Sequence, residues 1–247
     1  MSHSQAHPPG VHVSRRMALH GALGLAALTV IQRTSRAGES AADEVDAFLE
    51  RWARQTETHA GQDKPNEDEF LHRLCADLAR LDPAGFPERK QVSFQADGVA
   101  SGPVAVQMPF LVLQFDLDPG AVIPAHNHVG WSFLSMGVRG EAQVQHYELA
   151  GTAPEPGEER DTDFHVREVS SCLLTPGRTS SLTRTRANIH AFRAGENGAR
   201  FIDFGVQFPD PGEGYRSFSA LAVDDEPADR ERRVYAARWL GNIYAKD

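Results

Sequence analysis

Three histidines in the second half of the chain have a spacing that suits a metal site. His126 and His128 are separated by one residue, and His190 follows much later in the sequence. In an extended strand, residues i and i+2 face the same side, so the first two imidazoles can reach one point. Neutral imidazoles bind several divalent transition metals. Three imidazoles from two strands would therefore form a facial metal site.

The residues around these histidines are typical of short strands joined by turns. Gly120 and Pro124 flank the approach to the pair, and runs rich in Val, Phe, Ile and Thr recur after Pro87 between glycines and prolines. Regular short strands with turn signals predict an antiparallel sandwich or barrel. The expected strands are 90–96, 109–116, 130–137, 141–148, 164–174, 180–185, 189–193, 199–207 and 216–221. The tail, 232–244, fits either a helix or a strand.

Two helices are expected before the strands. The first has an apolar face at positions i, i+3, i+4 and i+7, formed by Val45, Phe48, Leu49 and Trp52. Ser40 and Asp43 form a candidate capping pair at its start. The second helix is expected from Asn66 to Leu81, because Asn66 can cap its start and Pro83 follows its end.

The residues around the three histidines resemble motifs of a known family. The spacing Gly120-x5-His126-x-His128 resembles the first motif of the cupins, which are small β-barrels that bind a metal inside, and the segment Ala121–Gly130 resembles one branch of them, named below. Cupins usually supply a glutamate ligand shortly after the second histidine, but the candidate positions here are Ser132 and Phe133. Without that carboxylate, the chain resembles the thiol dioxygenases, and most of all the plant cysteine oxidase and 2-aminoethanethiol (cysteamine) dioxygenase family. Asn188–Ala194 resembles that family's third-histidine motif, and Phe201–Phe204 resembles the strand that follows it.

The resemblance covers roughly residues 105–221 and implies a mainly β fold, a cupin (jelly-roll) β-barrel preceded by two N-terminal α-helices. It implies a non-haem Fe(2+) held by His126, His128 and His190. The implied enzyme is a thiol dioxygenase that adds both atoms of O2 to a small aminothiol or to an N-terminal cysteine, giving a sulfinate. Asp203 stands where the family has an aspartate near the substrate, so the resemblance implies a catalytic role for Asp203.

A ligand set of three neutral imidazoles suits this reaction on charge grounds. Without a carboxylate ligand, Fe(2+) keeps its full charge in the site, which favours binding of an anionic thiolate. Three coordination positions then remain for the thiolate, a second substrate donor and O2. Asp203 could accept a proton there or orient a ligand imidazole.

The residues also leave other interpretations open. The chain could be a non-catalytic cupin of the periplasm that binds a metal or a ligand, or an enzyme that uses another metal on a carbon substrate. Asp203 could instead be a surface residue at a strand end, and Trp131 and Phe133 could line the pocket or pack in the core. His146 and His165 are interpreted as non-ligands. Candidates for binding a substrate carboxylate are Arg139, Arg184, Arg186 and Arg193.

The N-terminus has the pattern of an export signal. Arg15 and Arg16 precede a weakly apolar run, 17–31, and small residues flank Arg36 where a signal peptidase could cut. The arginine pair resembles the twin-arginine signal, which directs folded proteins out of the cytoplasm. A membrane anchor is the alternative, but 15 residues span only about 22 Å of a ~30 Å hydrocarbon core. We expect an export signal over 1–37 and a periplasmic location.

The rest of the chain is expected to form an N-terminal helical segment, 38–88, and a cupin domain, 89–247. The formal net charge is −9, and the four arginines of the signal make the remainder still more acidic. An acidic body repels phosphate backbones, so a nucleic-acid partner is not expected. The only two cysteines, Cys75 and Cys172, cannot supply a four-thiolate zinc site, although a single disulfide between them stays open.

Overall fold

The computed structural model describes residues 36–88, 97–154, 162–208 and 218–242. The expected strand 90–96 lies outside these residues, as does the expected export signal up to residue 35. Two helices come first, α1 (Arg36–Ala60) and α2 (Glu67–Leu78), followed by a short 3-10 turn, η1 (Pro83–Gly85). The strands are β1 (Val99–Gln107), β2 (Phe110–Leu117), β3 (Val122–Asn127), β4 (Trp131–Leu149), β5 (Phe164–Leu174), β6 (Thr179–Leu182), β7 (Ile189–Gln207), β8 (Ser219–Val223) and β9 (Val234–Asn242).

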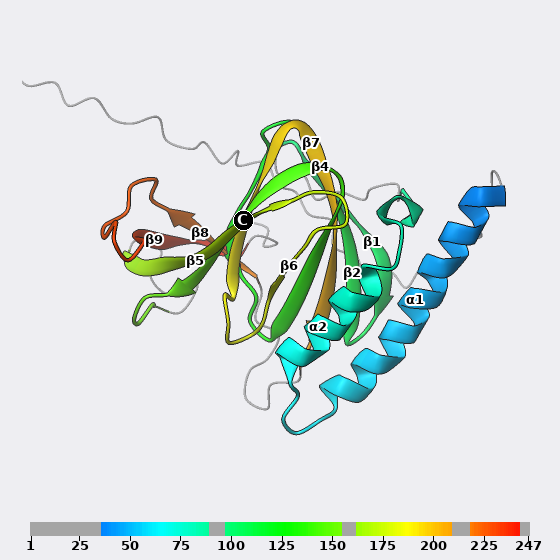
Figure 1. The fold of residues 1–247 in the computed structure, drawn as a ribbon. Helices are drawn as coiled ribbons and strands as arrows, with labels where there is room; N and C mark the ends of the chain where they lie inside the picture. The colour runs from blue at the N-terminus through cyan, green and yellow to red at the C-terminus, as the bar shows by residue number, and fades with distance from the viewer. Residues whose placement is uncertain (1–35, 89–96, 155–161, 209–217, 243–247) are drawn as a thin grey trace, which may run out of the picture.

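The strands form one antiparallel sheet that closes on itself. Its order is β1-β2-β7-β3-β8-β9-β5-β4-β6, and an additional pairing between β7 and β4 closes the ring. Figure 1 shows α1 and α2 on one side of this barrel and β5, β8 and β9 on the other. The expectation of a mainly β, jelly-roll-like cupin barrel preceded by two helices is confirmed.

The two longest strands correct the expected strand boundaries. Segments 130–137 and 141–148 are parts of one strand, β4, and segments 189–193 and 199–207 are parts of one strand, β7. The β4–β7 ladder runs through two register shifts, between Gly137 and Arg139 and between Gly140 and Ala142. Glycine is required at the bend, because Gly140 has φ +63° and a Cβ there would lie 2.1 Å from a carbonyl oxygen. The glycines therefore bend the strands and do not end them.

Three further strands were missed or left open by the sequence. β1 and β3 were not among the expected strands, although the segment that contains β3 was expected to be extended at its histidines. The tail is a strand, β9, which pairs with both β8 and β5. Gly120, with φ +73°, makes the turn before β3. That turn brings β3 onto β7, where His126 lies opposite His190.

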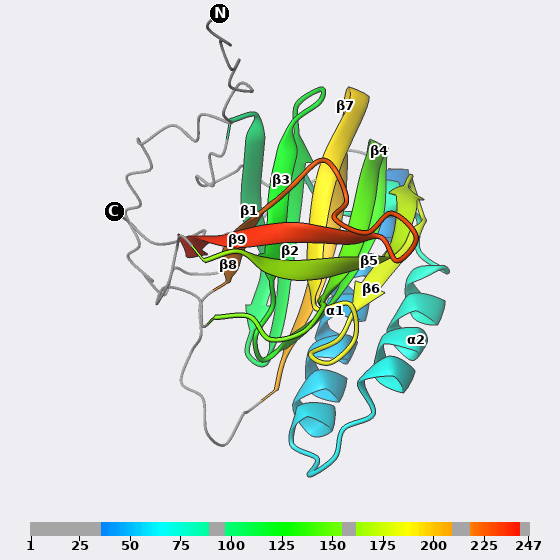
Figure 2. The ribbon, with the colours of Figure 1, turned by 90° about the vertical axis from the view of Figure 1, so that its left-hand side faces the viewer.

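The helices cover one face of the barrel. The expected apolar face of α1 is buried, with Phe48 and Trp52 at most 2% exposed. α1 begins at Arg36, so Ser40 lies inside the helix and does not cap it. Asn66 does cap α2, because its side chain accepts a hydrogen bond of 3.1 Å from the backbone N–H of Glu69. The two helices lie side by side against the sheet in Figure 2.

Separate clusters of buried side chains show which faces of the strands point into the barrel. On β7, Ile202, Phe204 and Val206 pack towards the helices, whereas Phe201 packs with Phe115 and Phe192 in a separate cluster. A third cluster, which includes Trp239, lies where β5, β8 and β9 pack over β3, β4 and β7. Figure 2 shows β5 and β9 crossing in front of these strands. Because successive residues of a strand face opposite sides, Asp203 faces the barrel interior together with Phe201.

The structure also shows the state of the two cysteines. Cys75 and Cys172 are both free, and the Sγ of Cys75 lies 3.1 Å from the hydroxyl of Thr179. None of the helices in the described part of the chain has an apolar stretch long enough to cross a membrane.

Candidate metal centre

The three histidines converge inside the barrel. His126 lies on β3, His128 follows directly after the end of β3, and His190 lies on β7. Their ring centroids are 4.5–4.7 Å apart. One ring nitrogen from each residue lies within 4.8 Å of the others, and all three side chains are buried. This is the geometry of a three-histidine metal-binding site.

Backbone carbonyls orient two of the rings. The Nδ1 of His126 donates to the carbonyl oxygen of Pro124 at 2.8 Å, and the Nδ1 of His128 donates to that of Asn188 at 3.3 Å. Each ring is thereby left with a free lone pair on Nε2. The Nε2 of His190 is buried with no hydrogen-bond partner. Because unpaired buried polar atoms are costly, these nitrogens fit a divalent metal ion.

Burial keeps the three imidazoles neutral. It lowers the pKa of His126 to about 4, and it lowers the pKa of His128 and His190 well below the ordinary value. Mutual repulsion among the rings adds to this effect at His128 and His190. A metal ligand must present an unprotonated nitrogen, so the site is ready to bind a cation at neutral pH.

No acidic side chain of the described residues joins the three histidines within the same reach. Ser132 turns away from the site, and its hydroxyl donates to Glu67 on α2. Phe133 packs on His128, with 4.7 Å between the ring centroids. The two positions at which a cupin glutamate was considered are therefore occupied by other contacts. Ser132 hydrogen-bonds to α2, and Phe133 packs on His128.

Aromatic rings enclose one side of the histidine cluster. Phe218 lies 5.2 Å from His128, and Trp131 stacks on Phe133 with 5.7 Å between centroids. Trp131 and Phe133 are therefore buried core residues, and Phe133 also packs directly on His128. Phe218 escaped the sequence analysis, because it lies just before β8 and far from the histidines in sequence. These rings make the surroundings of the site apolar.

Asp203 is a buried carboxyl and not a surface residue. It is 4% exposed and lies opposite Ser135 in the β4–β7 ladder. Burial raises the pKa of Asp203 to about 7, although a hydrogen bond with Ser135 opposes this. Its Oδ1 atom has no hydrogen-bond partner. The strand-end surface interpretation is wrong, while a catalytic role for Asp203 stays a prediction.

His146 lies closer to the site than the sequence analysis indicated. It faces His190 across the β4–β7 ladder, with 6.0 Å between ring centroids. Its Nε2 lies 2.8 Å from the hydroxyl of Ser180, and it is not grouped with the three converging histidines. The sequence did contain a signal for this position. Alternate residues of β4 share one face, and Ala142 and Val144 on the same face as His146 point into the barrel.

The four candidate arginines lie elsewhere. Arg184 and Arg186 form ion pairs with Glu67 and Asp68 on α2. Arg139 pairs with Asp116, and Arg193 is exposed. None of the four is placed by its contacts beside the histidines.

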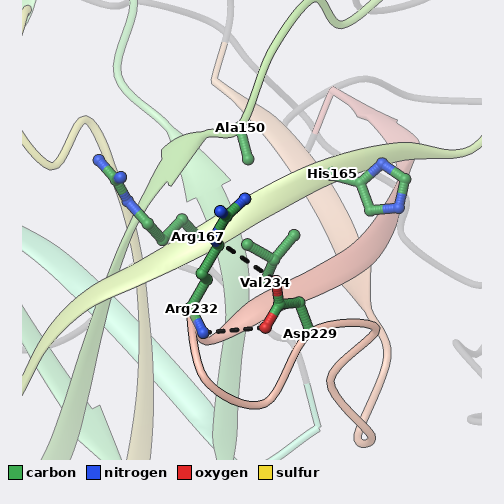
Figure 3. A pocket seen from close by; sticks show the side chains of 6 residues that line it. All are labelled: Ala150, His165, Arg167, Asp229, Arg232 and Val234. Atoms are coloured by element: carbon green, nitrogen blue, oxygen red, sulfur yellow. Dashed lines mark hydrogen bonds and ion pairs between the residues drawn. The ribbon is translucent and has the colours of Figure 1, made fainter.

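His165 belongs to a different pocket, on the surface between β5 and the loop before β9. This cavity of about 590 Å³ is shown in Figure 3 and is lined by Ala150, His165, Arg167, Asp229, Arg232 and Val234. Arg167 and Arg232 have acidic partners, Glu148 and Asp229. The interpretation of His165 as a non-ligand is consistent with this position.

The fold and the site together define a cupin with a three-histidine metal centre. Residues 94–205 match the model of the PCO_ADO family. This segment includes all three histidines and Asp203. Over this region the chain is similar to the PCO_ADO family, whose members are thiol dioxygenases. The expected class of enzyme, an oxidoreductase acting on thiols, is thereby confirmed.

Several solved structures match part of the chain at low similarity. KdgF from Halomonas sp. is 19% identical, with 49% of this chain and 89% of KdgF covered at a TM-score of 0.35. Pumpkin seed globulin is 15% identical, with 50% and 30% covered at a TM-score of 0.38. An RmlC-like cupin from Shewanella frigidimarina is 16% identical, with 50% and 87% covered at a TM-score of 0.34. No curated protein sequence matches the chain.

Proposed function

We propose that this protein is a non-haem iron thiol dioxygenase that adds both atoms of O2 to a thiol and releases a sulfinate. The observation that supports this most is the cluster of three neutral, buried imidazoles, which no acidic side chain of the described residues joins as a further ligand. Fe(2+), when bound there, would supply the redox chemistry that lets a thiolate react with O2. A ligand set without charge favours an anionic sulfur ligand.

The chain's own residues contribute a proton acceptor and a dry pocket. Asp203 faces the same interior, and a pKa of about 7 makes its carboxylate suited to take the proton of a substrate thiol at neutral pH. The aromatic wall of Trp131, Phe133 and Phe218 keeps water from the reacting sulfur.

We propose a small aminothiol or the N-terminal cysteine of a peptide as the substrate. A free amino acid would bring a carboxylate to the site. The arginines considered for binding a carboxylate are paired with α2, paired on the barrel exterior or exposed. A substrate without a carboxylate next to its thiol therefore suits the site better.

Oxygen uptake by iron-loaded protein tests this function. Cysteamine, a peptide with an N-terminal cysteine and free cysteine are each supplied, and products are identified by mass. We expect uptake with the first two thiols, matched by products that have gained two oxygen atoms. No uptake with any of the thiols would refute the proposal. Metal analysis of protein purified without added metal accompanies the assay, because imidazole sites also take zinc or nickel.

We further propose that the protein is exported to the periplasm by a twin-arginine signal. The support is the pair Arg15–Arg16 before the apolar run 17–31. Export in the folded state would let the barrel acquire its metal in the cytoplasm. Replacing both arginines by lysine should leave the protein in the cytoplasmic fraction, as immunoblots of fractionated cells would show. Undiminished delivery to the periplasm would contradict a twin-arginine signal.

A further inference from the structure

The first residue of α2, Glu67, reaches out of its helix into the barrel wall. Its side chain is 11% exposed and accepts four hydrogen bonds. Three come from Arg184: the backbone N–H at 3.1 Å, Nε at 2.9 Å and Nη2 at 2.7 Å. The fourth comes from the hydroxyl of Ser132 at 2.5 Å. This one carboxylate is thus saturated by groups from two separate segments of the barrel.

The first of these segments leads directly to a metal ligand. Arg184 belongs to a tight turn, 183–188, in which the Nδ2 of Asn188 donates to the carbonyls of Thr183 and Arg184. The same amide donates to the carbonyl of His128 at 3.1 Å, and its oxygen accepts from the His128 N–H at 3.0 Å. The backbone carbonyl of Asn188 accepts from the ring of His128. Contacts that fix the position of this turn therefore also fix the orientation of the His128 imidazole.

The second segment is the start of β4. Ser132 lies between Trp131 and Phe133, which form the aromatic wall beside His128. Glu67 therefore joins the two sides of His128, the turn that orients its ring and the strand that packs on it. Nε and Nη2 of Arg184 both donate to Oε1 of Glu67, and the pair is mostly buried, so these charge-assisted hydrogen bonds are stronger than neutral ones.

We propose that Glu67 is a positioning residue for the metal centre, which acts through Arg184 and Asn188 on His128. The residue lies outside the segment 94–205 that matches the family, so the N-terminal helices complete the site as well as covering the barrel. The inference rests on the proposed metal site, but it does not depend on which reaction the site performs. Residues that orient metal ligands typically change metal affinity by about 10–100-fold.

The neighbouring residue provides a matched control. Asp68 is also in the first turn of α2 and pairs with Arg186 of the same barrel turn at 2.7 Å. This pair is exposed, with 64% of the Asp68 side chain and 44% of the Arg186 side chain accessible. Asp68→Asn removes the same charge from the same end of the helix. It breaks no contact to Ser132, Arg184 or Asn188.

The test measures Co(2+) affinity by chelator competition in metal-free Glu67→Gln and Asp68→Asn proteins, with thermal unfolding as the check on folding. We expect Glu67→Gln to weaken Co(2+) binding by about 10–100-fold and to alter the visible absorption of the bound ion. We expect Asp68→Asn to bind Co(2+) as the parent does. Parental affinity and spectrum in folded Glu67→Gln would overturn the inference, and so would an equal loss in Asp68→Asn.

A double variant guards against a general loss of folding. Glu67→Gln alone leaves Arg184 as an unpaired, partly buried charge, and that defect by itself can unfold a protein. Glu67→Gln combined with Arg184→Gln removes both charges and should unfold near the parental temperature while binding Co(2+) as weakly as the single variant. Recovery of parental affinity in the double variant would overturn the inference, because a stray charge would then explain the single variant. Failure of the proposed reaction would appear separately, as parental protein that binds metal without consuming O2.

Discussion

His128→Ala should abolish metal binding and thiol-dependent oxygen uptake together. His128 supplies one of only three imidazoles, and the two that remain cannot hold an ion in a facial geometry. Since residues that merely support ligands already change affinity by about 10–100-fold, loss of a ligand should exceed about 100-fold. Iron content after purification and oxygen uptake with cysteamine are the two measurements.

The control for this experiment is His165→Ala. His165 is exposed on β5 and belongs to the separate surface pocket. The variant should keep its iron and its oxygen uptake. Normal iron content in His128→Ala would remove the basis of the metal assignment.

Asp203→Asn should keep the metal but lose most of the activity. Asparagine preserves the shape of the side chain and cannot accept a proton. A positioned general base typically contributes about 10²–10⁴-fold, so kcat should fall within that range. In the parent, activity should rise with pH as Asp203 loses its proton near pH 7. The variant should lack this rise, and an unchanged pH profile would show that Asp203 is not the base.

The same substitution has a second consequence for the stability of the metal-free protein. The folded pKa of Asp203, about 7, lies above its ordinary value of 3.8, so the folded state holds the proton over a wider pH range. Stability should therefore fall as pH rises from about 4 to about 7, and Asp203→Asn should remove this fall. Relative to the parent, the variant should gain a few kcal/mol more near pH 8 than near pH 4, measured by urea unfolding. An equal difference at both pH values would mean that burial does not raise this pKa.

The helices and the site histidines could be predicted because their signals are local. An apolar repeat marked α1, and Asn66 marked the start of α2. The predicted strand boundaries were wrong where a glycine bends a strand instead of ending it. Segments 130–137 and 141–148 were expected as separate strands, but Gly140 between them lies at a bend inside a continuous ladder. β1 was missed because it contains Gly102 and Pro103, which an edge strand tolerates at a bulge.

The surroundings of the site could not be predicted, because they depend on contacts between distant segments. Glu67 and Arg184 are far apart in sequence, and neither carries a motif that points to the other. His146 faces His190 only because β4 and β7 pair in one particular register. Phe218, just before β8, lies beside His128 although the two are far apart in sequence. Sequence spacing predicted the three candidate ligands, whereas the side chains that support them can be seen only in the folded barrel.

The opposition of His126 and His190 in one antiparallel ladder has a consequence for metal capture. Their imidazoles are brought together by the backbone hydrogen bonds that join β3 to β7. The cage is therefore preorganised, so an arriving cation needs to shed its water but need not order the protein around it. Vacant and loaded molecules should then share one backbone, and a thiol substrate would meet the same walls in either of them.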